Sequence, residues 1–126
     1  MTVNVVIDTN ALLIPFRFGI NVDKELQRIY GSATIYIPSS VIDEIQKIDI
    51  TDNERKSAIA LSHKYKIVNT INKGDRGVIE AANFVNGVIF TNDRNLMRTA
   101  LKMKISVVFM RKKNHLELHG NDLLEW

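Results

Sequence analysis

Two short polar motifs are the first residues in this sequence whose types could support chemistry. The motif DTN at positions 8–10 and the motif TND at positions 91–93 each follow a run of β-branched residues. Ligands of open parallel sheets bind beyond the carboxyl ends of the strands, and Asp8 and Asp93 would both lie there. Asp, Asn and Thr are also the residues that cap helix N-termini, so capping alone explains either motif. Both explanations stay open at this point.

Two further acids lie at the edges of apolar faces in predicted helices. At about 100° per residue, Glu44 falls at the border of a face formed by Val41, Ile42, Ile45 and Ile48. Asp75 has the same relation to a face formed by Val78, Ala82 and Val85. A carboxylate beside a buried face needs a partner, because an unpaired buried charge is costly. For Asp75, the alternative is a first-turn acid that the helix dipole stabilises.

A shared divalent cation would satisfy the electrostatics of Asp8, Glu44, Asp75 and Asp93. Without a counter-charge, clustered carboxylates repel one another and at least one of them binds a proton. The chain has no cysteine, and oxygen ligands select Mg²⁺ or Mn²⁺ over zinc. Such a cation lowers the pKa of a bound water and neutralises charge that develops at phosphorus. The four acids therefore predict phosphodiester hydrolysis.

Alternating strands and helices are predicted to position these acids. Short apolar runs indicate strands at residues 3–7, 34–37, 66–68, 87–91 and 105–109. Helical spacing indicates helices at residues 22–30, 41–48, 54–65, 75–85 and 92–101. The expected fold class is α/β, a three-layer α/β/α domain with a mostly parallel sheet of about five strands.

Length and composition favour a single domain over residues 1–126. A chain of 126 residues with 45% hydrophobic and 25% charged residues is typical of one globular unit. No apolar run could span a bilayer and no signal peptide is evident, so we expect a cytoplasmic protein without a membrane partner. Residues 113–126 are expected to pack on the core or on another subunit through Leu116, Leu118, Leu123 and Trp126.

Positive charge is concentrated late in the chain, although the net charge is only +3. Residues 94–113 contain only basic charges, at Arg94, Arg98, Lys102, Lys104, Arg111, Lys112 and Lys113. This run is either a phosphate-facing surface or a solvated helix face followed by a charged loop. The segment 16–18 is expected to be a short loop in which an aromatic ring could meet a base. His115 and His119 could bind metal only if the tail were helical.

Four segments together resemble the PIN-domain nucleases. They are VIDTNALL at 6–13, PSSVIDEI at 38–45, GDRGVIEAA at 74–82 and TNDRNL at 91–96. The resemblance extends from residue 3 to about residue 113. It is strongest to small archaeal PIN proteins related to the PIN nucleases of ribosomal RNA processing, and more distant to VapC-type toxins.

The resemblance implies a role for each matched residue. Asp8, Glu44, Asp75 and Asp93 would be the metal-binding acids, and Asn10 and Thr91 would help to orient them. The cations of this family activate water to cut RNA, and many members form homodimers. The expected partners are therefore RNA, a second copy of the chain, and an antitoxin or ribosome-assembly protein.

The sequence departs from the family pattern at two positions. Many relatives carry an acid where this chain has Asn95, and a second acid where it has Arg76. One cation would then be held firmly, and a second one weakly or only with substrate. Arg76, Arg94 and Arg98 could instead contact RNA phosphates, or be solvent-exposed charges.

Three other functions compete with the RNA-processing nuclease. A non-catalytic RNA-binding or ribosome-assembly module of the same fold would bind RNA without cutting it. A VapC-type toxin ribonuclease would pair with an antitoxin. A phosphoacceptor signalling domain needs a paired acidic motif after the first strand and a suitably placed lysine, and neither is evident.

Ser39 and Ser40 precede a helix and are expected to cap it.

Overall fold

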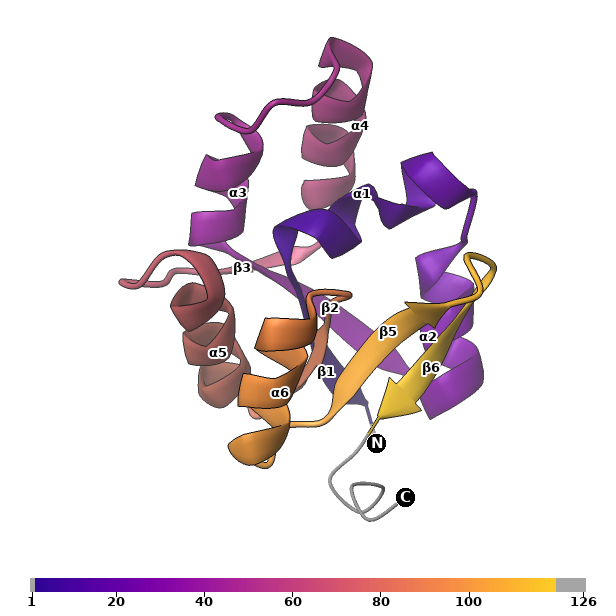
Figure 1. Ribbon diagram of the computed structural model, residues 1–126, viewed down its shortest axis with the longest axis vertical. Coiled ribbons are helices and arrows are strands. Elements are labelled where there is room, and N and C mark those ends of the chain that lie inside the picture. Colours follow the sequence, from indigo (N-terminus) through magenta and orange to yellow (C-terminus); the bar gives the residue numbers. More distant parts are fainter. Residues whose placement is uncertain (1, 120–126) are drawn as a thin grey trace.

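The sheet is the organising element of the fold. The computed structural model describes residues 2–119, and within them the sheet has six strands in the order β3-β2-β1-β4-β5-β6 (Figure 1). Their bounds are β1 Val3–Ile7, β2 Ala33–Pro38, β3 Lys66–Val68, β4 Val88–Phe90, β5 Val107–Arg111 and β6 His115–His119. The first five strands are parallel, and β6 runs antiparallel to β5. The expected parallel sheet is confirmed, with one antiparallel strand added.

Helices cover both faces of this sheet, which confirms the three-layer α/β/α class. Their bounds are α1 Thr9–Phe18, α2 Val22–Tyr30, α3 Ser39–Ile45, α4 Asp52–Ser62, α5 Gly74–Val85 and α6 Arg94–Lys102. In Figure 1, α5 and α6 lie in front of the sheet and α2 lies behind it. The helices α1, α3 and α4 pack together beyond the upper end of the sheet.

The core is centred on β1 and β4, the two adjacent middle strands. Val5, Val6, Ile89 and Phe90 are completely buried. Successive side chains of a strand point to opposite faces, so burial of consecutive residues requires helices on both sides. This explains why β4 is a continuous apolar run and why β1 is apolar apart from Asn4.

The helix α1 was not predicted, and the expectation of a loop at residues 16–18 was wrong. These three residues form the last turn of α1, which ends at Gly19 with a φ of 66°. Pro15 lies inside the helix, and proline is unfavourable there because it lacks the backbone N–H. Arg17 ties this end to α4, since its Nε donates to Glu54 Oε2 at 2.6 Å.

Residues 115–119 of the expected tail form β6 at one edge of the sheet. Leu116 on β6 is completely buried, whereas Leu118 is largely exposed. The backbone of Leu116 is held by α2: its N–H donates to Glu25 Oε1 at 2.9 Å, and its carbonyl accepts from Arg28 Nη2 at 2.7 Å. The expected packing of Leu123 and Trp126 lies outside the described residues.

The strand conformation also removes the histidine pair considered above. His115 and His119 belong to β6 and not to a helix, so the helical spacing that would have joined their rings is absent.

Across residues 2–119, none of the helices has the length and apolar character needed to cross a bilayer.

Candidate active site

A hydrogen-bonded chain of three residues joins the ends of β1 and β4. These strands pair in parallel with Ile7 beside Phe90, so the next residues, Asp8 and Thr91, emerge next to each other. Thr91 Oγ1 donates to Asp8 Oδ2 and accepts from the backbone N–H of Asp93 at 3.0 Å. The predicted meeting of the two motifs at one sheet edge is therefore observed, with the buried threonine hydroxyl as the bridge.

Both aspartates also cap helices, so the capping explanation offered for these motifs is confirmed. Asp8 Oδ1 accepts from the N–H of Ala11 at 2.8 Å and caps α1. Asp93 Oδ1 accepts from the N–H groups of Asn95 and Leu96, at 2.9 and 3.2 Å, and caps α6. Asp93 Oδ2 accepts no hydrogen bond from the described residues. Two helix N-termini, which favour negative charge, thus begin at this point.

Asp8 is the buried acid of the group, with 7% of its surface exposed. The pKa of its carboxyl is raised to about 6, mainly by burial and to a lesser extent by the charges of Asp93 and Asp75. The hydrogen bonds from Thr91 and from the N–H of Ala11 oppose this rise. At neutral pH the carboxylate is charged in a place that solvates it poorly, so a cation or a proton would be bound favourably.

Asp75 belongs to the same electrostatic neighbourhood but does not cap its helix. It is the second residue of α5, whose N-cap is Lys73, and its carboxylate accepts no hydrogen bond from the described residues. Its pKa is raised, first by desolvation and then by the charge of Asp93. The structure therefore brings Asp8, Asp75 and Asp93 close enough for their charges to act on one another.

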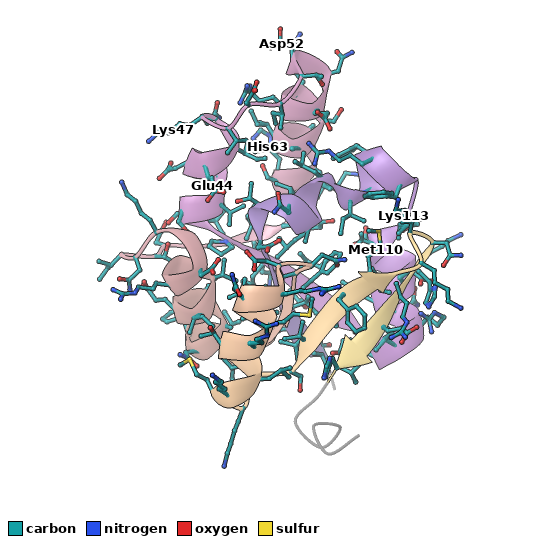
Figure 2. The ribbon with its side chains drawn as sticks, in the orientation of Figure 1. Glu44, Lys47, Asp52, His63, Met110 and Lys113 are labelled. Carbon is teal, nitrogen blue, oxygen red and sulfur yellow. The ribbon has the colours of Figure 1, made fainter. Side chains whose placement is uncertain are left out.

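Glu44 lies apart from these three acids in its interactions. It is half-buried on α3, as its position on the helix predicted, and Asp43 beside it is exposed. Glu44 is not among the groups that raise the pKa of Asp8 or Asp75. It lines a small pocket of about 170 Å³ together with Lys47 and Lys73. Figure 2 shows Glu44 on α3 with Lys47 further along the same segment.

The acids fit a hydrated cation better than one enclosed by protein ligands. Within residues 2–119, no three acidic, histidine or cysteine side chains lie close enough together to hold a metal ion. Magnesium usually keeps several waters and is bound through one or two carboxylates plus substrate phosphates. A buried carboxylate with a raised pKa beside an aspartate with a free oxygen meets this requirement.

The supporting polar residues differ in how the structure places them. Thr91 orients Asp8, as the resemblance implied. Asn10 is exposed and its side chain forms no hydrogen bond with any described residue, so nothing observed supports an orienting role. Arg76, Arg94 and Arg98 are exposed and form no ion pair within residues 2–119.

The basic run at residues 94–113 does not form one continuous element. Arg94 and Arg98 lie on α6, whose N-terminus starts at the acids. Lys112 and Lys113 lie in the turn between β5 and β6, where Figure 2 shows Lys113 on the far side from Glu44. Only the α6 part of the run is therefore adjacent to the candidate site.

Asn92 and Ser39 form contacts with distant segments that were not predicted from the sequence. Asn92 accepts from the N–H of Met110 at 2.6 Å and donates to its carbonyl at 3.1 Å, which fastens the TND loop to β5. Ser39 was expected to cap α3, but its Oγ instead accepts from the N–H of Thr70 at 2.9 Å. Ser40 does not cap either, and its buried hydroxyl has no partner in the structure. Such contacts join distant segments and leave no local pattern.

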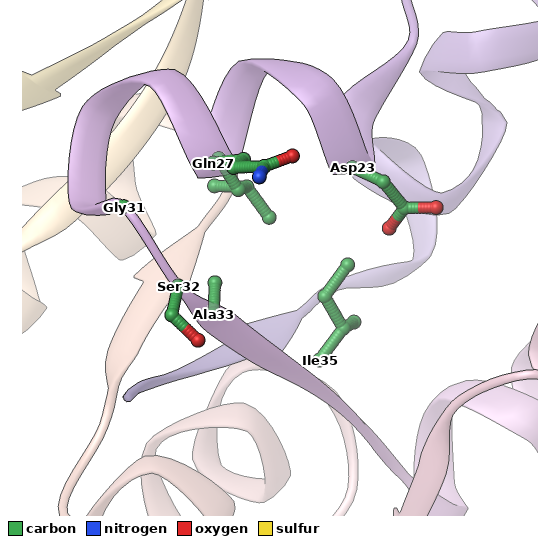
Figure 3. Close-up of a pocket in the computed structure, with 7 residues that line it drawn as sticks. Asp23, Gln27, Gly31, Ser32, Ala33 and Ile35 are labelled. Carbon is green, nitrogen blue, oxygen red and sulfur yellow. The ribbon is translucent and has the colours of Figure 1, made fainter. Parts of the chain in front are cut away.

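A second pocket lies at the opposite end of the sheet and has few side chains that could take part in catalysis. It has a volume of about 280 Å³ between α2 and the start of β2 (Figure 3). Ala33, which lines it, pairs with Val3 at the beginning of β1, far along the strand from Asp8. Its only acid is Asp23. We therefore place the candidate site at the carboxyl ends of β1 and β4.

Comparison with known proteins identifies the family. The model of the PIN-like domain family matches residues 5–113, and this chain belongs to that family. It is 29% identical to Ribonuclease VapC4 of Methanocaldococcus jannaschii over 92% of this chain and 96% of that protein. It is also 29% identical to Ribonuclease VapC9 of Archaeoglobus fulgidus, over 85% of this chain and 82% of that protein. The resemblance inferred from the four motifs is confirmed.

Solved structures support the fold independently. The PIN domain endonuclease Utp24 superposes with a TM-score of 0.76 over 91% of this chain and 90% of that chain, at 20% identity. A domain of a functionally unknown protein from Methanocaldococcus jannaschii gives a TM-score of 0.57 over 86% of this chain and 91% of that one, at 19% identity. At these identities the similarity defines the PIN-like architecture alone.

Proposed function

We propose that this protein is a divalent-metal-dependent endoribonuclease whose active site is the carboxyl edge of β1 and β4. The observation that carries the proposal is the buried carboxylate of Asp8, joined through Thr91 to Asp93 in a chain of the PIN-like family. RNA is the proposed substrate because two relatives that align over most of their length are named ribonucleases.

Mg²⁺ or Mn²⁺ is the proposed cofactor, and Asp8, Asp75 and Asp93 would hold it. When bound, the cation would supply a water of lowered pKa and neutralise charge on the phosphate being cut. Glu44 on α3 completes the proposed acidic set. The oxygen-only donor set and the mutual repulsion of the acids support this choice of metal.

The residues around the acids are proposed to bind and orient the RNA backbone. The exposed guanidinium groups of Arg94 and Arg98 follow Asp93 along α6, and Arg76 follows Asp75 on α5. Each is unpaired within the described residues and therefore available to a phosphate. Thr91 would hold Asp8 in position by donating to one carboxylate oxygen, which leaves that carboxylate less free to rotate.

A toxin role is the second candidate, and it is favoured by the names of the two relatives. Both are VapC proteins, and their alignments cover most of each chain. The protein would then be paired with an antitoxin, whereas a role in ribosomal RNA processing would require a ribosome-assembly partner. Homodimer formation is proposed for either role.

The direct test replaces Asp8 by Asn, which keeps the size of the side chain and removes its charge. Asp8→Asn should abolish cleavage of an RNA panel in Mn²⁺ or Mg²⁺, and chelation should abolish cleavage by the unmodified protein. Asp43→Asn, which alters an exposed acid on α3, is the matched control and should cleave normally. Full activity in Asp8→Asn would reject the assignment, and RNA that is shifted but never cut would favour the non-catalytic binding module.

A further inference from the structure

A groove of about 600 Å³ begins at the candidate site and runs between α5 and α6. Asp75 at the start of α5 belongs both to the acidic group and to the lining of the groove. From there, the lining continues along α5 to Asn83 and crosses to Thr99 and Met103 on α6. Figure 1 shows the two helices side by side in front of the sheet. Pockets of this volume are of the size that small ligands occupy.

The groove contains an apolar surface that is partly open to solvent. Ile79 is 9% exposed, whereas Met103, the C-cap residue that follows α6, is 49% exposed. A methionine thioether is polarizable and makes favourable contacts with aromatic rings. A flat ring could therefore lie against Met103 and Ile79, which would also remove exposed apolar surface from water.

Neutral hydrogen-bonding groups lie beside this apolar surface. Asn83 is exposed, and its side-chain amide forms no hydrogen bond with the described residues. Such an amide presents both a donor and an acceptor. Thr99 Oγ1 donates to the carbonyl of Asn95 at 3.0 Å, so its oxygen can still accept from a ligand.

The lining of the groove carries two carboxylates, Asp75 and Glu80, and one guanidinium, Arg76. Glu80 directs its carboxylate oxygens to the backbone N–H groups of Ile71 and Asn72, at 2.9 to 3.1 Å, and these bonds lower its pKa. The acid thus fastens the loop before α5 to the helix. Arg76 lines the groove near Asp75 without an ion-pair partner within residues 2–119.

We infer that this groove binds one unpaired nucleotide of the RNA, next to the phosphate at the acidic group. Two flat apolar faces, an edge of donors and acceptors and one flanking phosphate are the features of an unpaired nucleotide, and proteins read RNA mostly in this form. The base would lie against Met103 and Ile79, its edge would meet Asn83 and Thr99, and the phosphate would meet Arg76. This inference rests on the proposed ribonuclease function and adds to it a nucleotide-binding groove between α5 and α6.

The test removes the two ligand-facing groups and leaves the acids unchanged. Asn83→Ala, Met103→Ala and the double variant are compared with Phe84→Ala, which alters the exposed neighbour of Asn83 outside the groove lining. The double variant should raise the KM for an unstructured RNA about tenfold, in line with losing a hydrogen bond and an apolar contact. Its kcat should stay near that of the unmodified protein, and Phe84→Ala should leave both constants unchanged.

A binding measurement without divalent metal separates this inference from the proposed function. A short unstructured RNA oligonucleotide should shift the amide NMR signals of Asn83, Thr99 and Met103, and the double variant should bind it about tenfold more weakly. If the protein cleaves no RNA but these shifts occur, the nucleotide groove stands and the ribonuclease proposal fails. If RNA is cut while the groove signals stay unmoved and the double variant keeps its KM, the groove inference fails alone. Absence of both cleavage and binding rejects both.

Discussion

Asp8 shows how one carboxylate can serve the fold and the candidate site together. One of its oxygens caps α1 and the other accepts from Thr91, so the side chain is fixed in place before any ligand binds. The same position is buried, and an ionised carboxyl is poorly solvated there. The folded chain therefore binds a proton on Asp8 more tightly than the unfolded chain does.

The raised pKa of Asp8 predicts a pH-dependent loss of stability. The folded chain binds this proton more tightly than the unfolded chain does, so the stabilisation is complete below the unfolded pKa of 3.8 and is lost as pH rises through about 6. The difference between these values corresponds to about 3 kcal/mol. Asp8→Asn should not lose this stability, since its amide can accept from Ala11 and donate to Thr91.

Urea unfolding followed by circular dichroism in metal-free buffer would measure the effect. The stability of Asp8→Asn relative to the unmodified protein should increase between about pH 4 and pH 7. Asp43→Asn provides the reference for loss of an exposed negative charge on α3. A difference between Asp8→Asn and the unmodified protein that does not change with pH would contradict the raised pKa.

The site residues that follow a strand end or lie at the border of a helix face could be predicted from the sequence. Asp8 and Asp93 could be paired because parallel strands deliver their last residues to one edge. Glu44 could be placed at the border of a buried face by helical spacing. Asn92 could not be assigned, because its partner Met110 lies on another strand, and the amide of Asn10 meets none of the described residues.

At the scale of elements, α3 and α5 approach so closely that no side chain fits at Gly77. A Cβ atom there would lie 2.5 Å from Ser40 Oγ and 2.6 Å from the carbonyl oxygen of Asn72. One of these neighbours is a side chain and the other is backbone. The spacing between the helix that carries Glu44 and the helix that carries Asp75 therefore depends on a glycine.

Gly77→Ala should destabilise the protein and displace α5. Overpacking costs about 1–3 kcal/mol, against a gain of about 1 kcal/mol in helix propensity. Thermal or urea unfolding should show a net loss of up to about 2 kcal/mol.

A double-mutant cycle with Ser40→Ala would identify the contact that causes this loss. Ser40→Ala alone removes a buried hydroxyl without a partner and should be neutral or slightly stabilising. In the double variant, the substitution should restore part of the stability, because the backbone contact with Asn72 remains. Strict additivity of the two substitutions would rule out the proposed contact.

The elements themselves were predictable where apolar periodicity is strong, and α2 was bounded correctly from its sequence. Two elements were missed for different physical reasons. The helix α1 was missed because Pro15 is unfavourable inside a helix. Near the end of a helix, however, a residue without an N–H is tolerated when packing compensates. β6 was missed although its sequence HLELH alternates polar and apolar residues, because it lacks the β-branched and aromatic residues typical of strands and is fixed by pairing with β5.

At the scale of the whole molecule, side chains from α2 bind backbone groups of β6, the strand at one edge of the sheet. Glu25 and Arg28 bind the N–H and the carbonyl of Leu116 on β6, and they also pair with each other at 3.1 Å. An open edge strand is a template for pairing with another chain. The two side chains occupy the backbone groups through which such pairing would begin.

Arg28→Ala should therefore weaken this contact with β6 and favour self-association. We expect a small drop in melting temperature and a rise in light scattering with protein concentration, since the carbonyl of Leu116 loses its partner. Lys24→Ala on the same helix is the matched control, because that exposed side chain makes no hydrogen bond within residues 2–119. Equal scattering by the two variants would show that the arginine does not protect the edge.

The bridge between Asp8 and Thr91 joins positions 83 residues apart. A ribosome must therefore deliver β4 before the carboxylate that emerged first can meet its hydroxyl partner. A chain that ends before β4 would therefore lack the hydroxyl that fixes the Asp8 carboxylate. The candidate site can form only after most of the polypeptide has been synthesised.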